Sequence, residues 1–591
     1  MAFQVSPGVN VSEIDLTTVV PAVATSTGAF AGVFRWGPVN EPILVNSENT
    51  LSARFGKPYA NTSWQNAETF FTAANFLSYS NSLYVVRVDN GNNAIAGANS
   101  APVEAKYPGE LGNSLEALVV RGSGVEVEGT LEEFEIDVSA SRSEASFDAN
   151  TQINVSGDEI SVGDILELED GSRLEISDIS GGTITFANRY TGIDNIGDGT
   201  SPVNITKLWK GVNFVASDPV SEDHIHVVII DEDGEISGTP GTVLEVYENL
   251  SVNPGVKSFD GSSNYYVDVI DQSSGYVNTT DEVISTGANY FSFIGGQDGD
   301  DESNVSPGDL ASGFDVFKNP DDIDVSLVLT GKSNSTIASY VIDNIVDFRK
   351  DAVAFISPEF TDTTASDIVE FRNLLPSSSY AVMDSGYKYQ YDKYNDVYRW
   401  VPLNGDIAGL CARTDDQRDP WFSPAGYNRG RVKNVIKLRF NPNRSERDAI
   451  YKSGVNPVIT QPGQGTVLFG DKTLLSQPSA FDRINVRRLF IVLEKAIAIA
   501  SKSTLFEFND EFTRTQFKNL VEPFLRDVEG RRGIFDFRVV CDETNNTPEV
   551  IDSNRFIGDI YIKPARSINF IQLNFVAVRT GVEFEEIVGQ F

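Results

Sequence analysis

Residue types that carry catalysis or bind metals are scarce in this 591-residue chain. Its two histidines, His224 and His226, lie two positions apart on an expected strand and therefore share one face. Two imidazoles on one face can begin a metal site, but there is no third histidine, and Cys411 and Cys541 lie far away in the sequence. We expect no metal site at this pair and no cofactor elsewhere.

Three further motifs resemble chemical sites and fail on spacing. The acidic run 298–302 resembles a calcium loop, which needs glycine at position six and glutamate at position twelve, where this chain has Ser303 and Asp309. The segment 463–465 lacks the further glycines and the lysine of a phosphate loop, and no nucleophile elbow is present. Carboxylates are too abundant for a glycosidase pair to stand out. We expect an acidic turn between domains at 298–302 and a protein that is not an enzyme.

The composition excludes several other classes of protein. With 84 acidic and 46 basic residues the net charge is −38, which argues against nucleic acid as a partner. Hydrophobic residues make up 40%, so wholesale disorder is excluded, and no apolar run is long enough to span a bilayer. The start shows no secretory signal, and two cysteines favour a reducing cytoplasm. We expect a soluble chain of roughly three to five domains without membrane insertion.

Both ends of the chain have the period-two pattern of a β-strand. A terminal strand has unpaired backbone donors and acceptors, so it must dock on a sheet. Base rates favour docking on its own domain. The apolar members of these two arms, residues 1–21 and 582–591, are Val5, Val9 and Val11 in the first and Val582, Phe584 and Val588 in the second.

The middle of the chain alternates between strand and helix patterns, which predicts a largely parallel sheet with right-handed connections. Expected strands are 83–88, 324–329, 352–356 and 380–383. Expected helices are 63–79, 335–348 and 364–375.

Two stretches read as β-rich. Residues 125–206 carry 18 acidic and 3 basic side chains, a net −15, and Asp170-Gly171 supplies a hairpin turn, so we expect a small solvated β-domain inserted into another domain. The second stretch, 224–295, contains a buried strand at 227–230 and an expected strand at 265–267. After it, the carboxy-terminal part predicts helices at 485–501 and 510–528 and strands at 535–540, 557–562 and 568–578.

Several segments together resemble the tail sheath proteins of contractile-tailed bacteriophages. They are SPGVNVSEID (6–15), FRWGP (34–38), KYPG (106–109) with Gly112-Asn113 nearby, DIAG (406–409), PWFSPAG (420–426), NVRRL (485–489) and residues 555–562. Each is weak alone, but their order and spread over almost the whole chain make the resemblance specific.

The resemblance implies a structural subunit that polymerises as stacked hexameric rings around a tail tube. Contraction would drive the tube through the host envelope for genome delivery, and the arms would add strands to the sheets of neighbouring subunits. The implied partners are further copies of the chain, the tail tube protein, and baseplate and tail terminator proteins. The implied location is the virion tail sheath, assembled in the host cytoplasm. Alternatives are the sheath of a phage-derived injection machine and an acidic polysaccharide-active enzyme or adhesin.

The expected architecture is α+β and α/β, with a sheath-type α/β core, a carboxy-terminal α+β domain, inserted β-rich outer domains and strand arms at both termini. The expected division is an N-terminal arm (1–21), an α/β core (22–88 plus 321–460), a β-rich insertion (89–124 plus 207–320), an acidic outer β-domain (125–206), a C-terminal inner domain (461–581) and a C-terminal arm (582–591).

One segment is basic within this acidic chain. Residues 480–535 carry ten basic and eight acidic side chains, a net +2. We hypothesise that the expected helix at 485–501 faces an acidic tube through charged contacts that salt weakens. The alternative is that its basic groups pair locally with Asp482 and Glu494. The candidate tube-facing residues are Arg483, Arg487, Arg488, Lys495 and Lys502.

Overall fold

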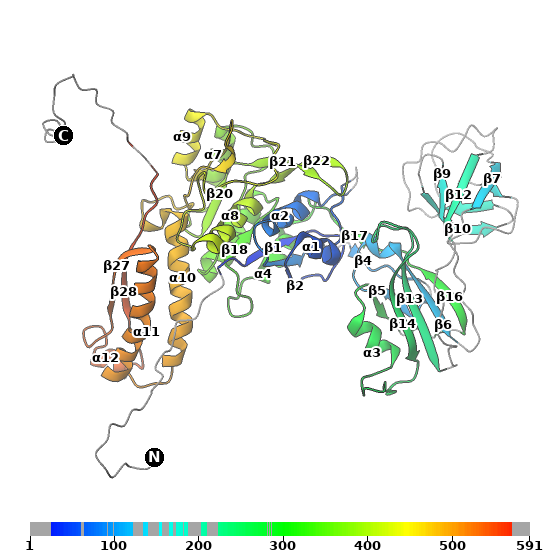
Figure 1. Cartoon of the computed structure of the whole chain (residues 1–591), viewed down its shortest axis with the longest axis horizontal. Coiled ribbons are helices and arrows are strands. Elements are labelled where there is room, and N and C mark those ends of the chain that lie inside the picture. Colours follow the sequence, from blue (N-terminus) through cyan, green and yellow to red (C-terminus); the bar gives the residue numbers. More distant parts are fainter. Residues whose placement is uncertain are drawn as a thin grey trace, which may run out of the picture.

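The computed structural model describes residues 25–569 and Gln572, apart from 61–63, 91–92, 99, 281, 283 and 285, and between 122 and 222 it describes only six strands. The described residues form a central α/β region, an inserted antiparallel β region, a six-stranded barrel and a C-terminal α+β region (Figure 1). This mixed, multidomain architecture confirms the expected fold class. Both arms, 1–21 and 582–591, lie outside the described residues.

A seven-stranded sheet forms the central region and unites distant parts of the chain. All neighbours are parallel except β2 and β3. Ala29 pairs with Tyr84 on one side and with Val328 on the other, so the strand after the first arm lies between strands from two chain segments. In sheet order the strands are β2 (Pro42–Val45), β3 (Leu83–Arg87), β1 (Gly28–Gly32), β18 (Leu327–Leu329), β19 (Val353–Ile356), β20 (Ala381–Asp384) and β24 (Val455–Asn456).

Helices cover both faces of this sheet, as the near-continuous apolar strands require. Leu327 and Leu329 point into one core and Val328 into the other, which is the alternation of a strand buried on two sides. The first core is shared with α2 (Ala67–Leu77) and α8 (Asn404–Gln417). The second is shared with α4 (Pro307–Asp315), the helical segment α5–η2–α6 (Ser335–Tyr340, Val341–Val346, Asp347–Arg349), α7 (Ala365–Leu374) and α9 (Arg444–Lys452).

Helices α2 and α8 approach so closely that α8 needs glycine at the contact. A Cβ on Gly405 would lie 2.3 Å from the backbone oxygen of Thr72. We expect Gly405→Ala to lower the free energy of unfolding by about 2 kcal/mol, because the helices must move apart. Gly530→Ala, at the end of the C-terminal helix α11 (Glu511–Gly530) with nothing within 4 Å, is the control and should be neutral or slightly stabilising. Chemical denaturation measures both, and equal effects would contradict the packing argument.

The insertion between β3 and β18 is built on a four-stranded antiparallel sheet. Its order is β14 (Thr242–Ser251), β13 (His224–Asp231), β6 (Leu115–Arg121) and β16 (Gly287–Ser292). Two short pairs accompany it, β5 (Val103–Ala105) with β15 (Val277–Thr279) and β4 (Asn93–Ala94) with β17 (Gln297–Asp298). The expected buried strand at 227–230 is confirmed as the middle of β13.

The strand expected at 265–267 is wrong. Helix α3 (Tyr266–Ser273) begins there, and Tyr266 and Ile270, four residues apart, are its buried side chains. Aromatic and β-branched residues favour strands, but here tertiary packing of one helical face outweighs that preference.

Six strands of the acidic segment form a closed antiparallel barrel, which confirms its β character. They are β7 (Phe134–Ser139), β8 (Ile153–Val155), β9 (Ile165–Leu168), β10 (Arg173–Ser180), β11 (Thr183–Phe186) and β12 (Val203–Trp209). β9 and β10 pair with each other on either side of Asp170-Gly171, as the turn signal predicts.

The acidic run 298–302 lies where the insertion meets the central region, and most of it is buried. Arg35 donates to Asp298 at 3.2 Å, and the backbone N–H of Glu110 donates to the same carboxylate at 2.8 Å. The Glu302 carboxylate accepts the backbone N–H of Thr69, at the start of α2, at 2.8 Å. These carboxylates therefore join the insertion to the central region. The run lies between these two regions, as expected, and most of it is buried.

This junction predicts a pH effect on stability. Burial and the nearby carboxylate of Glu302 raise the pKa of Glu68 from 4.5 to about 7, against the opposing charge of Lys332. The folded state therefore holds this proton more strongly than the unfolded chain, so its stabilising effect is full below pH 4.5 and is lost as pH rises through 7.

We expect Glu68→Gln to remove on the order of 2 kcal/mol of the decline in unfolding free energy between pH 5 and 8. Urea unfolding of the full chain at constant ionic strength measures this decline. Glu370→Gln, at an exposed position of α7, is the control and should leave the slope unchanged. An unchanged slope in Glu68→Gln would contradict the assignment.

The C-terminal region packs two long helices against a hairpin, at the end of the molecule opposite the insertion (Figure 1). Its elements are η3 (Ala480–Asp482), α10 (Ile484–Ser501), η4 (Lys502–Thr504), α11 (Glu511–Gly530), β27 (Ile534–Val540), α12 (Pro548–Asp552) and β28 (Asp559–Pro564). The remaining elements are α1 (Glu48–Phe55), η1 (Glu110–Ser114), β21 (Tyr387–Asp392), β22 (Val397–Pro402), β23 (Lys437–Leu438), β25 (Val458–Gln461) and β26 (Gly465–Leu468).

Candidate assembly surfaces

The hairpin β27–β28 has one buried and one exposed face. Ile534 and Val539 point into the core formed with α10 and α11, whereas Phe535 and Tyr561 are exposed. In the part of the chain that the structure describes, neither strand pairs with a third strand. Unpaired strand edges beside exposed aromatic side chains can accept an added strand through main-chain hydrogen bonds.

Thr25, the first described residue after the N-terminal arm, contacts a buried ion pair between α10 and α8. Both terminal nitrogens of Arg488 donate to the Asp415 carboxylate, at 2.8 and 2.5 Å, and the two side chains are 4% and 6% exposed. The same guanidinium donates at 3.2 Å to the backbone oxygen of Thr25, the first described residue. Thr25 is therefore hydrogen-bonded to an ion pair whose loss would strongly destabilise the folded protein.

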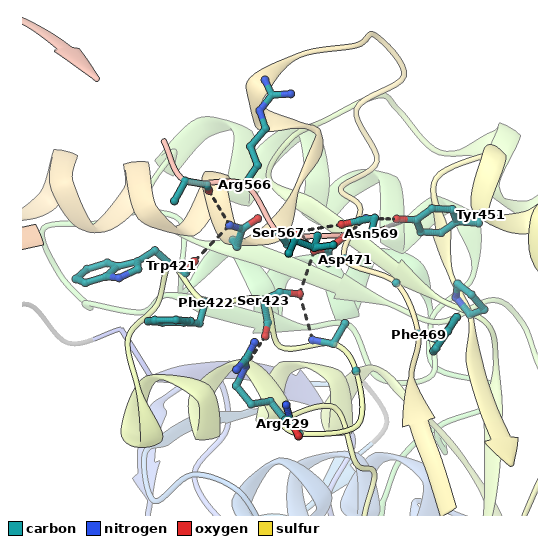
Figure 2. A pocket seen from close by; sticks show the side chains of 18 of the residues that line it. Trp421, Phe422, Ser423, Arg429, Tyr451, Phe469, Asp471, Arg566, Ser567 and Asn569 are labelled. Carbon is teal, nitrogen blue, oxygen red and sulfur yellow. Dashed lines mark hydrogen bonds between the residues drawn. The ribbon is translucent and has the colours of Figure 1, made fainter. Parts of the chain in front are cut away.

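A second polar network, centred on Asp471, holds residues 565–569, the last continuous described segment before the C-terminal arm (Figure 2). The Asp471 carboxylate accepts the Ser567 hydroxyl at 2.6 Å and the Asn569 amide at 3.1 Å. Asn569 also donates to the Tyr451 hydroxyl at 2.9 Å, and Asn485 of α10 donates to the backbone oxygen of Ala565 at 3.2 Å. Residues 565–569 are thus held to both the central and the C-terminal region.

Two of the five candidate tube-facing residues are engaged near the start of α10. Arg483 donates to the Tyr451 hydroxyl at 2.6 Å and lies 3.6 Å from Asp482. Arg487 is buried, lies 3.3 Å from Glu494 and has its guanidinium over the ring of Tyr380 at 4.4 Å. For these two the structure shows the local pairing that the sequence left open as the alternative.

Carboxylates distant in the sequence engage two more of the candidates. Arg488 pairs with Asp415, as described, and Lys495 lies 2.6 Å from Asp324 and 3.4 Å from Asp351. No sequence signal identifies these carboxylates, because their proximity depends on the packing of α10 on the central sheet. Lys502 is exposed and is the one candidate for which the described residues show no ion pair. Contact between any of the five and a tube stays a prediction.

The corner between α10 and α11 exposes a group of large apolar side chains. The α10–α11 corner consists of Ile499, Leu505, Phe506, Phe508 and Phe512, all of them exposed. Phe506 also has a φ of +70°, which non-glycine residues rarely adopt. Large apolar side chains that are exposed within one short stretch of the chain point to a contact with another molecule.

A groove of about 870 Å³ lies between the central region and the C-terminal arm's base. Figure 2 shows Phe422, Phe469 and Tyr451 along it, with Ser567 and Asn569 at the centre. Its walls come from the loop before β23, from α9, from the loop after β26 and from residues 565–569.

The motifs that resemble chemical sites have structural roles. His224 and His226 do lie on one strand, β13, where His226 is fully buried and its Nδ1 accepts the backbone N–H of Asn249 at 3.2 Å. Gly463, in the turn between β25 and β26, and Gly465, the first residue of β26, have φ values of 77° and 80°. Among the described residues, no group of three His, Cys, Asp or Glu side chains is placed to hold a metal ion. No described helix is long and apolar enough to cross a membrane.

Three family profiles match successive parts of the chain. The tail sheath protein Gp18 domain III N-terminal region matches residues 25–88, the phage tail sheath protein central domain matches 327–474, and the phage tail sheath C-terminal domain matches 476–577. These spans correspond to β1–β3, to the second half of the central sheet, and to the α10–β28 region.

Relatives match over the full length. The tail sheath proteins of Vibrio phage KVP40 and Enterobacteria phage T4 are each 35% identical to this chain over 99% of both chains. The crystal structure of a sheath tail protein from Listeria innocua shares the fold, with a TM-score of 0.52 and 11% identity over 92% of this chain and 96% of that one. The family matches and the full-length identity together show that this chain belongs to the tail sheath proteins of contractile-tailed phages.

Proposed function

We propose that this chain is a non-enzymatic sheath subunit that polymerises as stacked hexameric rings around a tail tube and contracts to drive the tube through the host envelope. Full-length identity to phage tail sheath proteins is the observation that carries this function. Because those relatives match across the insertion as well, a phage virion is favoured over a phage-derived injection machine. The partners are the tube protein, baseplate and tail terminator proteins, and assembly takes place in the host cytoplasm.

In this proposal both arms dock on neighbouring subunits. The open edges of β27–β28 offer acceptor sites for extended segments, and Val5, Val9 and Val11 or Val582, Phe584 and Val588 supply the alternating apolar face. The hydrogen bonds that hold Thr25 and residues 565–569 support this arrangement, because they connect the segments next to both arms to helix α10.

Contraction is then a rigid-body reorientation of subunits that stay connected through their arms. Main-chain hydrogen bonds of an added strand do not depend on the orientation of the domain from which the arm comes. In this proposal the acidic barrel lies on the outside of the sheath, where like charge keeps cylinders apart.

We place the tube contact at the α10–α11 corner instead of the first turns of α10. Four of the five basic candidates are engaged within the subunit, whereas Lys502 lies beside exposed Leu505 and Phe506 in the chain and is itself exposed. Phe506→Asp should lower the amount of subunit that co-sediments with isolated tail tubes at least tenfold. Phe348→Asp, an equally large change at an exposed site on α6, is the control and should not. Equal binding by both variants would contradict this placement.

Negative-stain microscopy of the purified full chain tests the function itself. Rings, tubes or striated cylinders are expected. Persistent monomers in the presence of tail tubes, together with activity on polysaccharides, would overturn the proposal in favour of an acidic enzyme or adhesin.

A further inference from the structure

The stretch between α8 and the first residue of α9 is basic, in a chain whose net charge is −38. Residues 420–445 contain six basic residues and no acidic one, and within the described part of the chain none of the six forms an ion pair. Val432 packs against the core that the central sheet shares with α2 and α8, so this stretch covers that face of the sheet. The six basic residues are Arg429, Arg431, Lys433, Lys437, Arg439 and Arg444.

Positive side chains lie close to one another on this surface. The guanidinium of Arg413, near the end of α8, lies over the Tyr79 ring at 5.2 Å, and the ammonium of Lys433 lies over the same ring at 4.5 Å. Arg413 also donates to the backbone oxygens of Arg429 and Arg431. Burial and the positive charge of Arg413 lower the pKa of Lys433. The basic face consists of Arg413, Arg429, Arg431 and Lys433, whose mutual repulsion a partner rich in carboxylates would relieve.

Most carboxylates near these cations in the chain are already engaged. Asp415 pairs with Arg488, and Asp419 pairs with Arg531. Asp416 is exposed at the end of α8. Between residues 413 and 433, one carboxylate therefore remains against the four cations of the basic face.

The opposite face of the central sheet is acidic. Residues 303–347 contain seven acidic and two basic residues. Phe314 of α4 and Ile342 of η2 lie in the second core, on the other side of the sheet from α2 and α8. The acidic face consists of Asp309, Asp315, Asp321, Asp322 and Asp343, which are exposed or half-buried and form no ion pair with any described residue.

Like charges gather on this acidic face as well. Asp315 and Asp343 come from α4 and η2, which pack against each other. Burial and the negative charge of Asp343 raise the pKa of Asp347. Lys318, the nearest lysine in the chain, lies over the ring of Phe348 at 5.5 Å. The two faces of one sheet thus carry opposite charges that their own subunit does not neutralise.

We propose that the basic face of one copy binds the acidic face of the next copy, front to back across the central sheet. This inference rests on the proposed polymerisation and names a charged contact between sheet layers, separate from the addition of strands by the arms. Because the faces lie on opposite sides of one sheet, any pair of copies leaves one basic and one acidic face free, so the contact repeats as a ring or helix requires. Exposed ion pairs are individually weak and screened by salt, so this contact orients the copies without locking them.

Two charge-reversed proteins test the contact. One carries Arg431→Glu with Lys433→Glu and keeps its acidic face, and the other carries Asp321→Lys with Asp343→Lys and keeps its basic face. Alone, each brings like charges together, so the critical concentration for sheath assembly should rise at least tenfold. Mixed in equal amounts, they should assemble within about twofold of the wild-type concentration, because each supplies the face that the other needs.

A third protein controls for net charge. Lys257→Glu with Arg526→Glu changes the net charge by the same amount as the reversal of the basic face, at exposed sites outside both faces. Its critical concentration should stay within about twofold of wild type. Raising the salt from about 0.05 M to about 0.5 M should bring the critical concentration of wild type closer to that of the reversed proteins, because the contact is screened.

The outcomes separate this inference from the function on which it rests. Assembly of both reversed proteins alone at the wild-type concentration, or an equal loss in the control, overturns the assignment of the faces and leaves the proposed function standing. A mixture that stays unassembled overturns the second copy as the partner. Failure of the wild-type chain itself to form sheaths overturns the proposed function.

Discussion

Deleting residues 1–21 should leave a folded subunit that no longer forms sheaths. Five main-chain hydrogen bonds of an added strand, at about 1 kcal/mol each, amount to about 5 kcal/mol per link, or more than a thousandfold in the critical concentration. The deletion retains Thr25, so the contact of its backbone oxygen with Arg488 is preserved. Sedimentation velocity and negative-stain microscopy over a range of concentrations measure the change.

Point variants distinguish strand docking from a general need for the arm. Val9→Asp with Val11→Asp places two charges on the apolar face and should abolish assembly as the deletion does. Asn10→Asp with Ser12→Asp adds the same charge to the other face and should have a much smaller effect. If both pairs act equally, net charge and not a strand face governs docking.

Arg488→Met should destabilise the subunit by about 3–5 kcal/mol, the largest effect we expect from a single substitution. Removing one partner leaves the Asp415 carboxylate buried without its counter-charge, and it also frees the backbone oxygen of Thr25. Lys563→Met is the control. The Lys563 side chain is 73% exposed and pairs with Asp536, which is 59% exposed, so its loss should cost less than 1 kcal/mol. Chemical denaturation of the full chain compares the two.

The pH dependence of unfolding tests whether the buried Asp415 carboxylate causes the loss of stability in Arg488→Met. Burial already raises the pKa of Asp415 although Arg488 opposes it, so without Arg488 that pKa rises further. A raised carboxyl pKa stabilises the folded state at low pH, and the deficit of Arg488→Met should therefore shrink as pH falls through the raised pKa of Asp415. The double variant Arg488→Met with Asp415→Leu should recover most of the loss at neutral pH. A deficit that is independent of pH would indicate lost packing instead.

Local periodicity was sufficient for most of the secondary structure. The strands at 352–356 and 380–383 and the helix at 364–375 appear within a residue or two as β19, β20 and α7. Each is a short run whose apolar pattern depends only on neighbouring residues. The helix α3 was missed because its two buried anchors, Tyr266 and Ile270, lie among residues that favour a strand when read alone.

The basic side chains of α10 show what local reading cannot determine. Their number and their place on one helix were visible in the sequence, and so was local pairing with Asp482 or Glu494. Their partners Asp415 and Asp324 are 73 and 171 residues away. Whether a cation faces a partner molecule or the interior depends on which surface the helix buries.

The sequence by itself determined the family, the α/β core and the acidic β insertion, because these follow from composition, short-range periodicity and ordered motifs. Only the tertiary structure decided that β1 lies between strands from two distant segments and that the bases of both arms are held beside α10. The same holds for the groove, whose arginines come from residues 429–447 and 532–566. Long-range packing energy selects such arrangements, and no window of sequence contains both partners of a contact that is made across the fold.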